Sequence, residues 1–306
     1  MTDSRNLLKA AQMARALVSG VLRLSTDKSD LGELTGHVVR SVGTARSYQQ
    51  CVFDFLRWQL GRGLGLNEPV LRSDIDSYLL HQSAVWRQKT LDQHRQALSL
   101  VFAVNATYVE AEVPTAVSGR AYTLVEMELI ARHQQPHNAL SSHLAFFGGL
   151  RAAEMHELRR ADELAREPGR RWHADLFVGL PPGRRYSTTG KGGLARNVWL
   201  PKDLAELLEQ TRREAPVLVT DRTIRRHAFY SIGGGHAFSE SVSDASKRAL
   251  GFSLGAHGFR HAYAQSRIAT LVALGYDLLD AFEIVSNEMG HMRAEILAHY
   301  LPQRVT

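Results

Sequence analysis

Residues 105–122 (NATYVEAEVPTAVSGRAY) separate two long segments of regular apolar spacing, and they themselves contain a proline and a glycine and show no period. A stretch of this kind is typical of an exposed linker between domains. The length of 306 residues is also sufficient for two hydrophobic cores. We therefore predict four parts: an N-terminal helix and linker at 1–40, a helical domain at 41–110, a linker at 111–122 and a second domain at 123–306.

The segment before this linker is predicted to be entirely helical. Apolar residues recur at helical spacing in four stretches: 6–24, 44–60, from about 73, and 89–104. Thr44 or Ser47 can cap the second of these helices. Cys51, the only cysteine, lies in the apolar pattern of the same helix. We therefore expect Cys51 to be a buried side chain and the protein to occupy a reducing compartment.

Three basic residues lie in the N-terminal half of the 89–104 helix or just before it: Arg87, Lys89 and Arg95. A helix N-terminus with basic side chains is a good phosphate-binding surface, so these residues are candidate DNA contacts. A solvated helix face is the more ordinary explanation for any single one of them, and the sequence leaves both open.

Helices also begin the second domain. Thr123 and Glu126 have the spacing of a capping box at the start of one helix. An apolar helix at about 139–147 ends in Gly148-Gly149, which permits a tight turn that presents Arg151. A further helix is predicted at 152–158, and others begin at Pro201, Ser241, His257 and Phe282.

The middle of this domain is predicted to contain β-structure. Leu176, Val178 and Leu180 alternate, as in a half-buried strand. Residues 184–188 and 196–200 flank Gly190-Lys191-Gly192-Gly193, which is a hairpin signal that places Lys191 at or beside the turn. A short strand at 217–219 is also expected.

The residues with the most specific chemistry gather near the C-terminus. His257 and Arg260 are followed by Gly290-His291 and then by Tyr300. This set suits attack of a phenol oxygen on a phosphodiester. A tyrosine in such a position is more commonly a packing residue, and His257 with His261 also has metal-pair spacing. No third ligand follows that pair, so no metal or other cofactor is predicted.

Four segments carry a family resemblance: GGLRAAEMHELR (148–159), TTGKGGLARNVWLP (188–201), HGFRHAYA (257–264) and MGHMRAEILAHYL (289–301). In this order they resemble the catalytic domain of the tyrosine recombinases, the phage-integrase superfamily. Residues 40–110 resemble its SAM-like core-binding domain. The resemblance implies a mainly α fold with a small antiparallel β-sheet, in which a helical DNA-binding domain precedes an α+β catalytic domain.

The resemblance also implies roles for individual residues. Tyr300 would be the nucleophile that forms a 3′-phosphotyrosyl bond to DNA. Its weak nucleophilicity at pH 7 calls for a base, and His257 is the candidate. The remaining roles are phosphate clamps for Arg151 and Arg260, general acid for Lys191, a phosphate hydrogen bond for His291 and a supporting role for Glu154.

Two features depart from the family pattern. Arg260 and His291 lie 31 residues apart, which is longer than the usual interval and predicts longer helices around 268–285. Only six residues follow Tyr300 in this sequence, whereas many relatives carry a C-terminal segment that controls neighbouring subunits. We therefore expect another element, such as the 6–24 helix, to supply that control.

The charge of the chain is compatible with these roles. The net charge is +6, and only six of the 37 basic residues are lysines. Arginine is the better bidentate phosphate ligand, although GC-rich genomes also favour its codons. The sequence shows no apolar run of membrane-spanning length and no signal-peptide core, so we expect a cytoplasmic, nucleoid-associated protein.

The predicted function is site-specific DNA recombination, for integration, excision or inversion. The expected partners are double-stranded DNA, a homo-tetramer on that DNA, and accessory DNA-bending or directionality proteins. Two alternatives remain at this point. A type IB topoisomerase shares the nucleophile and clamp, and a regulator on an integrase scaffold would bind DNA without cleaving it.

Overall fold

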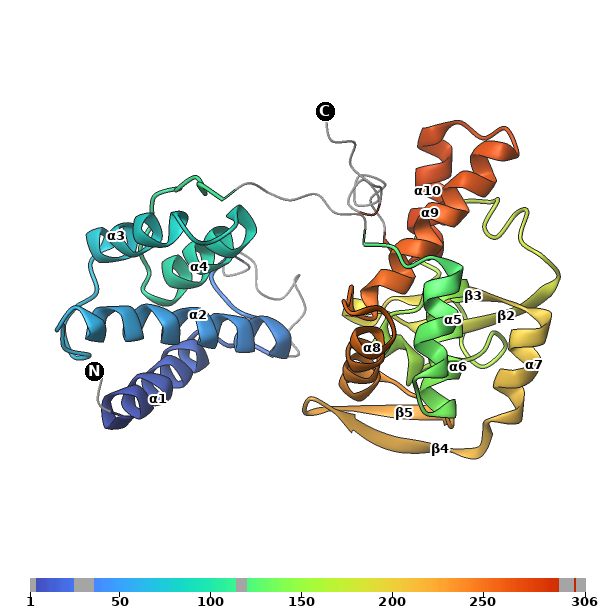
Figure 1. The fold of residues 1–306 in the computed structure, drawn as a ribbon, viewed down its shortest axis with the longest axis horizontal. Helices are drawn as coiled ribbons and strands as arrows, with labels where there is room; N and C mark the ends of the chain where they lie inside the picture. The colour runs from blue at the N-terminus through green and yellow to red at the C-terminus, as the bar shows by residue number, and fades with distance from the viewer. Residues whose placement is uncertain (1–3, 25–35, 114–119, 292–299, 301–306) are drawn as a thin grey trace. The chain divides into compact units, whose positions relative to one another are not determined.

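The computed structural model describes residues 4–24, 36–113, 120–291 and 300, without the side chain of Lys191. The chain divides into two compact units, Met1–Ala116 and Val117–Thr306, so the boundary falls within residues 111–122 (Figure 1). Among the described residues, no helix is both long enough and apolar enough to span a membrane.

The first unit is built from helices alone. These are α1 (Ser4–Gly20), α2 (Val42–Gly61), α3 (Arg72–Ser83) and α4 (Gln88–Val101). The other three helices all contact α2, which is the longest helix of the unit (Figure 1). Ala10, Ala14 and Val18 of α1 are buried in the same core as residues of α2 to α4. The N-terminal helix therefore belongs to the hydrophobic core of this unit.

Aromatic side chains fill the centre of that core. Tyr78 packs edge-on against Phe55, and its hydroxyl lies 3.2 Å from Nδ1 of His94. Burial lowers the pKa of His94 to about 4, so this histidine is neutral at pH 7. Burial likewise raises the pKa of the Cys51 thiol to about 12. Cys51 is therefore an unreactive packing residue, as expected from its place in the apolar pattern.

The start of α2 differs from the sequence prediction. Neither Thr44 nor Ser47 is the N-cap; Ser41 is, and its Oγ accepts a hydrogen bond of 3.0 Å from the Thr44 backbone N–H. The helix therefore begins at Val42. The Ser41 and Thr44 hydroxyls also lie 2.7 Å apart, so the predicted cap residue instead supports the real one.

The second unit is mainly α-helical and contains two small antiparallel sheets, which confirms the predicted fold class. Its elements are α5 (Leu124–Arg132), α6 (Pro136–Gly148), η2 (Ala152–Met155), β1 (Arg159–Arg160), β2 (Gly183–Thr189), η3 (Lys191–Gly193), β3 (Ala195–Pro201), α7 (Lys202–Gln210), β4 (Arg212–Asp221), β5 (Ile224–Tyr230), α8 (Gly235–Leu250), α9 (His257–Ala273) and α10 (Leu278–Glu288).

Several local predictions for this unit are confirmed. Glu126 and Thr123 form the reciprocal bonds of a capping box at the start of α5. Strands β2 and β3 pair from Gly183↔Pro201 to Thr189↔Ala195, on either side of the glycine-rich turn. In each case the deciding groups are close in sequence, so the pattern was visible without tertiary information.

Two other predictions are wrong. The helix expected at 152–158 is only the single 3₁₀ turn η2. The strand expected from the alternation of residues 176–180 is absent, because Phe177 and Gly179 adopt positive φ angles of 67° and 72°. The backbone N–H of Phe177 instead donates to Oε1 of Glu288 at 2.8 Å. A buried acceptor 111 residues away therefore overrides the local pattern.

Two further boundaries were misplaced. Pro201 ends β3 and caps α7 instead of occupying the first helical position. The strand expected at 217–219 is part of a longer hairpin, in which β4 pairs with β5.

The core of the second unit is centred on α6. This helix contacts α5, α8, α9 and strand β3 (Figure 1). A separate apolar cluster joins α9 to α10 and includes Tyr300. The two helices lie side by side, with a turn at 274–277 that explains how the long interval between Arg260 and His291 is accommodated.

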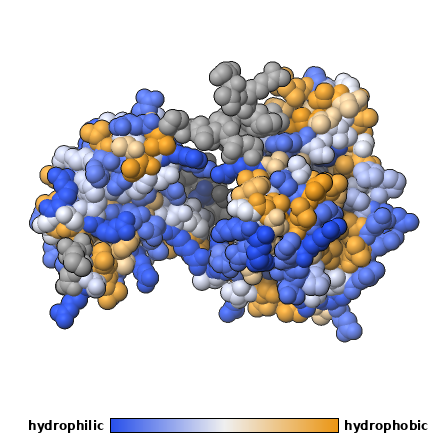
Figure 2. All heavy atoms as spheres, viewed as in Figure 1, coloured by the Kyte–Doolittle hydropathy of each residue, from blue (hydrophilic) through white to orange (hydrophobic). Residues whose placement is uncertain are grey.

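The outer end of this helix pair is apolar. Val272, Leu274, Leu278 and Leu279 are all exposed there, and apolar residues gather in that region of Figure 2. The 17 residues of α9 place this patch about 25 Å from the N-terminal end of the helix. The predicted site residues His257 and Arg260 lie at that N-terminal end.

Candidate active site

A left-handed turn presents Arg151. Gly149 ends α6 with φ 60°, and a Cβ atom at this position would come within 2.6 Å of the Tyr263 ring. A glycine is therefore required both by the backbone conformation and by the close packing. The chain then enters η2 with Arg151 as an extended residue.

Glu154 lies at the centre of a buried group of arginines and is 2% exposed. It accepts hydrogen bonds from Nη1 of Arg151 at 2.6 Å and from Nη2 of Arg196 at 2.7 Å. Nη1 of Arg260 lies 3.9 Å away. Burial alone would raise the pKa of Glu154, but the three guanidinium groups outweigh burial and lower it to about 2. Glu154 is therefore ionised and oriented at neutral pH.

Arg260 connects two of the turns that form the site. It is fully buried, and it donates hydrogen bonds to the carbonyl oxygens of Gly149 and Met289. Burial and repulsion from Arg151 lower the pKa of Arg260 to about 10, so it remains charged at pH 7. A positive charge is thus held in place by the backbone on both sides of the site.

A second glycine turn carries His291. Gly290 has φ 69°, and the backbone N–H of His291 donates to the carbonyl of Ser286 at 2.8 Å. Nε2 of His291 lies 3.1 Å from Nη2 of Arg151 and 3.2 Å from Nη2 of Arg260. Because both guanidinium groups are donors, Nε2 is the unprotonated ring nitrogen. Burial and these two charges lower the pKa of His291 to about 3.

Tyr300 points its hydroxyl into this group and is 5% exposed. Its Oη lies 3.2 Å from Nε2 of His291 and 3.4 Å from Nε2 of His257. Desolvation and repulsion from Arg260 lower the pKa of His257. Since more than a third of His257 is exposed, water limits the size of that shift. Both histidines are neutral at pH 7. Nε2 of His291 already accepts from the two guanidinium groups, so His257 is the candidate base for the phenol proton.

The structure thus brings together six of the predicted site residues: Arg151, Glu154, His257, Arg260, His291 and Tyr300. For Lys191 only the backbone is described, as the first residue of η3. A Cβ atom on the preceding Gly190 would lie 3.3 Å from Oε1 of Glu154. The β2–β3 connection therefore begins directly beside the arginine group.

The three candidate DNA contacts of the first unit differ in their exposure to solvent. Arg87 is the N-cap residue of α4 and Lys89 lies in its first turn, and both are exposed. Arg95 lies nearly two turns beyond Lys89 and is half-buried, with its Nε shielded from solvent and without a hydrogen-bond partner. Arg87 and Lys89 are thus available at the surface, whereas Arg95 partly faces the protein.

Sequence reasoning missed Arg196. This residue of β3 is buried, donates to Glu154, and also donates to the carbonyl of Glu288 at 2.6 Å. The sequence contained a signal that could have identified Arg196, because Arg196, Val198 and Leu200 alternate on the inward side of the predicted strand. A charged residue in an inward register implies a buried partner.

Within the described ranges, no group of three or more His, Cys, Asp or Glu side chains is arranged to hold a metal ion. His257 and His261, which have metal-pair spacing, both face Tyr300.

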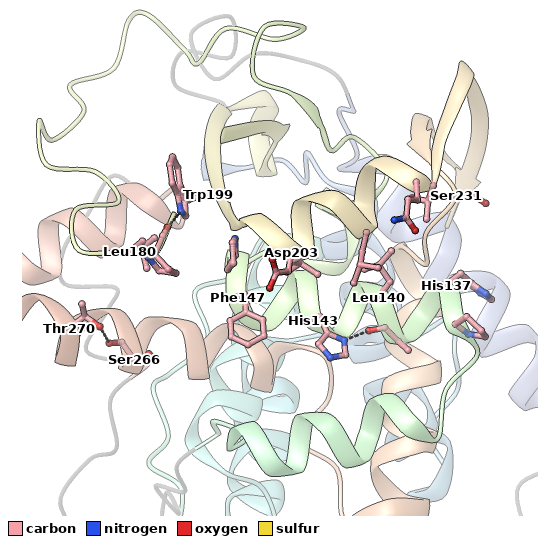
Figure 3. Close-up of a pocket in the computed structure, with 18 of the residues that line it drawn as sticks. His137, Leu140, His143, Phe147, Leu180, Trp199, Asp203, Ser231, Ser266 and Thr270 are labelled. Atoms are coloured by element: carbon pink, nitrogen blue, oxygen red, sulfur yellow. Dashed lines mark hydrogen bonds between the residues drawn. The ribbon is translucent and has the colours of Figure 1, made fainter. Parts of the chain in front are cut away.

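An apolar cavity of about 1230 Å³ lies in another part of the second unit (Figure 3). Leu140 and Phe147 of α6 line it on one side, with Asp203 of α7 across from them and Leu180 nearby. None of the predicted site residues lines this cavity. The charged group around Tyr300 is therefore a separate site.

Comparison with known proteins supports the fold. No protein-family model matches the sequence, and no curated protein sequence matches it. Among solved structures, XerH site-specific recombinase bound to palindromic difH substrate, in a post-cleavage complex, matches with a TM-score of 0.55 at 15% identity, over 100% of this chain and 94% of that chain. The Tn1549 transposon integrase (residues 82–397) in complex with circular intermediate DNA matches with a TM-score of 0.53 at 12% identity, over 95% and 96% of the two chains. The chain has the tyrosine recombinase fold.

Proposed function

We propose that this protein is a site-specific DNA recombinase that cleaves and rejoins DNA through a 3′-phosphotyrosyl intermediate. The observation that carries the proposal is the position of the Tyr300 hydroxyl, between two neutral histidines and beside two charged arginines. The fold it shares with DNA-bound recombinases and a transposon integrase supports the same function.

The reaction would begin with proton transfer from Tyr300. His257, neutral at pH 7 and 3.4 Å away, would accept the phenol proton as the oxygen attacks phosphorus. The new bond joins Tyr300 to the 3′ phosphate, and the 5′ oxygen leaves. Lys191 would protonate that leaving oxygen, from the connection that begins beside Glu154. The phosphotyrosyl bond conserves the energy of the phosphodiester, so rejoining needs no nucleotide cofactor.

Charge stabilisation would come from Arg151 and Arg260. The Nη2 atom of each arginine already lies within hydrogen-bond distance of Nε2 of His291. The two guanidinium groups and the imidazole therefore converge on a small volume beside the Tyr300 hydroxyl. A phosphate there would take up the guanidinium donors through its non-bridging oxygens. Donors fixed before the reaction stabilise the charge that grows in the transition state. Glu154 orients Arg151 and would not itself react.

We also propose DNA, further copies of the same chain and accessory proteins as partners. Double-stranded DNA would be the substrate, and Arg87 and Lys89 of α4 would contribute phosphate contacts in the first unit. Exchange between two duplexes calls for four active subunits, so we propose a homo-tetramer on DNA. Accessory DNA-bending or directionality proteins would bias the reaction, and the protein would act at the nucleoid in the cytoplasm.

Covalent capture tests the proposal with no target sequence specified in advance. Nicked duplexes with a randomised central region are incubated with protein, and adducts are recovered under denaturing conditions and sequenced. The wild type is expected to enrich one sequence, and Tyr300→Phe is expected to recover nothing. Equal adduct with Tyr300→Phe would contradict the nucleophile assignment.

Covalent capture combined with three further assays separates the two alternatives. A topoisomerase would relax supercoiled plasmid and form adducts with little sequence enrichment. A non-catalytic regulator would retain a DNA sequence on a native filter but give no adduct. Strand exchange between two duplexes that both carry the enriched sequence distinguishes the recombinase from either.

A further inference from the structure

Three residues of α9 contact different parts of Tyr300. His257, His261 and Gln265 lie four residues apart, so they form one stripe along the helix surface. His257 lies beside the hydroxyl, as described above. The other two have no part in the chemistry proposed so far.

Gln265 holds the backbone of the tyrosine. Its Nε2 donates a hydrogen bond of 2.7 Å to the carbonyl oxygen of Tyr300. This bond joins a residue on the third turn of α9 to one that lies 35 positions further along the chain. A side-chain amide with this donor geometry fixes the main chain at Tyr300 independently of the phenol.

His261 holds the ring. The centroids of the His261 and Tyr300 rings are 4.5 Å apart, with an angle of 38° between the planes. His261 is buried, and burial lowers the pKa of its imidazole, although a hydrogen bond to the Tyr300 backbone offsets part of that shift. The face of the phenol is thus covered while the hydroxyl remains directed at His291 and His257.

We propose that Gln265 and His261 are positioning residues that dock Tyr300 on α9 of its own chain. Gln265 holds the backbone, and His261 holds the ring and also contacts the backbone. Tyr300 is docked in this way in the free protein, without DNA. An effect of the docking on DNA cleavage rests on the proposed function, because a docked phenol starts the reaction close to both histidines.

Nitration by tetranitromethane tests the docking without DNA. Each tyrosine is followed by peptide mass spectrometry, and the exposed Tyr108 serves as the internal reference. Gln265→Met keeps the side-chain length but removes the donor, and it is expected to raise Tyr300 nitration relative to Tyr108 about three- to tenfold, as for the loss of one hydrogen bond. Gln210→Met, the same change at an exposed position at the end of α7, is the matched control and should leave the ratio unchanged.

Two substitutions test whether the ring of His261 protects Tyr300 from nitration. His261→Ala is expected to raise Tyr300 nitration, whereas His261→Phe retains a ring at that position and is expected to restore part of the protection. Unchanged nitration in both Gln265→Met and His261→Ala would overturn the proposal. An equal rise in Gln265→Met and Gln210→Met would also overturn it, because the effect would not depend on the bond.

Covalent capture supplies the catalytic readout. Gln265→Met is expected to slow adduct formation several-fold at saturating DNA while DNA affinity stays unchanged, which a general loss of structure would not produce. Increased nitration with no adduct even from the wild type would support the docking and refute the proposed function. Slower adduct formation with unchanged nitration would refute the docking while leaving the proposed function standing.

Discussion

Glu154 and Glu288 are both buried carboxylates of the second unit, but their charge partners differ. Glu288 forms two hydrogen bonds with the single guanidinium of Arg267, at 2.8 and 2.9 Å, and also accepts from the Tyr263 hydroxyl. Glu154 lies within 4 Å of three guanidinium groups. One cluster is electrically balanced, and the other has an excess of two positive charges.

The arginines of the two clusters respond in opposite ways. Burial works against the charge of Arg267, but the hydrogen bonds and charge of Glu288 raise its pKa. Burial and the neighbouring Arg151 lower the pKa of Arg260 to about 10. The Arg267–Glu288 pair thus carries no net charge, whereas the cluster of three arginines around Glu154 is expected to be stabilised by an added anion. A phosphodiester supplies that anion in the proposed reaction.

The largest effect on stability is expected at the balanced cluster. Glu288→Gln leaves the buried charge of Arg267 uncompensated and should lower the unfolding free energy by about 3–5 kcal/mol. Urea titration followed by circular dichroism measures it. Glu283→Gln, at an exposed position of the same helix, is the control and should change little. A loss below about 1 kcal/mol for Glu288→Gln would remove the distinction between the clusters.

Arg260→Met is expected to separate stability from chemistry. The lost hydrogen bonds to Gly149 and Met289 cost stability, but relief of repulsion with Arg151 offsets part of that cost. We expect a loss of about 1–2 kcal/mol, together with adduct formation slowed about 10²- to 10³-fold. A variant as unstable as Glu288→Gln would indicate that the positive excess is only structural.

The pH dependence of the unfolding free energy should show that the arginines around Glu154 keep His291 neutral. Its pKa in the folded protein is about 3, below the value of about 6.5 in the unfolded chain. Between these values the unfolded state binds more protons, so the unfolding free energy falls as pH falls from about 6.5. Removing this group in His291→Asn should reduce the slope between pH 6 and 5 by about 1 kcal/mol per pH unit. An unchanged slope would show that His291 does not contribute.

The smallest expected effect is stabilisation by a simple oxyanion. Orthovanadate at three times its Kd should raise the unfolding free energy of the wild type by about 0.8 kcal/mol. Glu283→Gln should respond in the same way, and Arg260→Met should not respond. Equal stabilisation of all three proteins would place the anion outside the Glu154 cluster.

Much of the fold followed from short-range patterns. The Thr123–Glu126 capping box, the glycine turn that presents Arg151 and the β2–β3 hairpin depend on groups within a few residues of one another. The order of the site residues could likewise be recognised from their spacing. The strand expected at 176–180 failed because its backbone bonds to Glu288, far along the chain.

The sequence by itself determined which chemical groups are present, in what order, and where the chain can turn. Only the tertiary structure decided that Arg196 is the third arginine around the carboxylate of Glu154, and that Gln265 and His261 face Tyr300. The physical reason is that burying a charge or an amide requires a partner wherever packing brings one within reach. Such partners lie tens of residues away, and no local period records them.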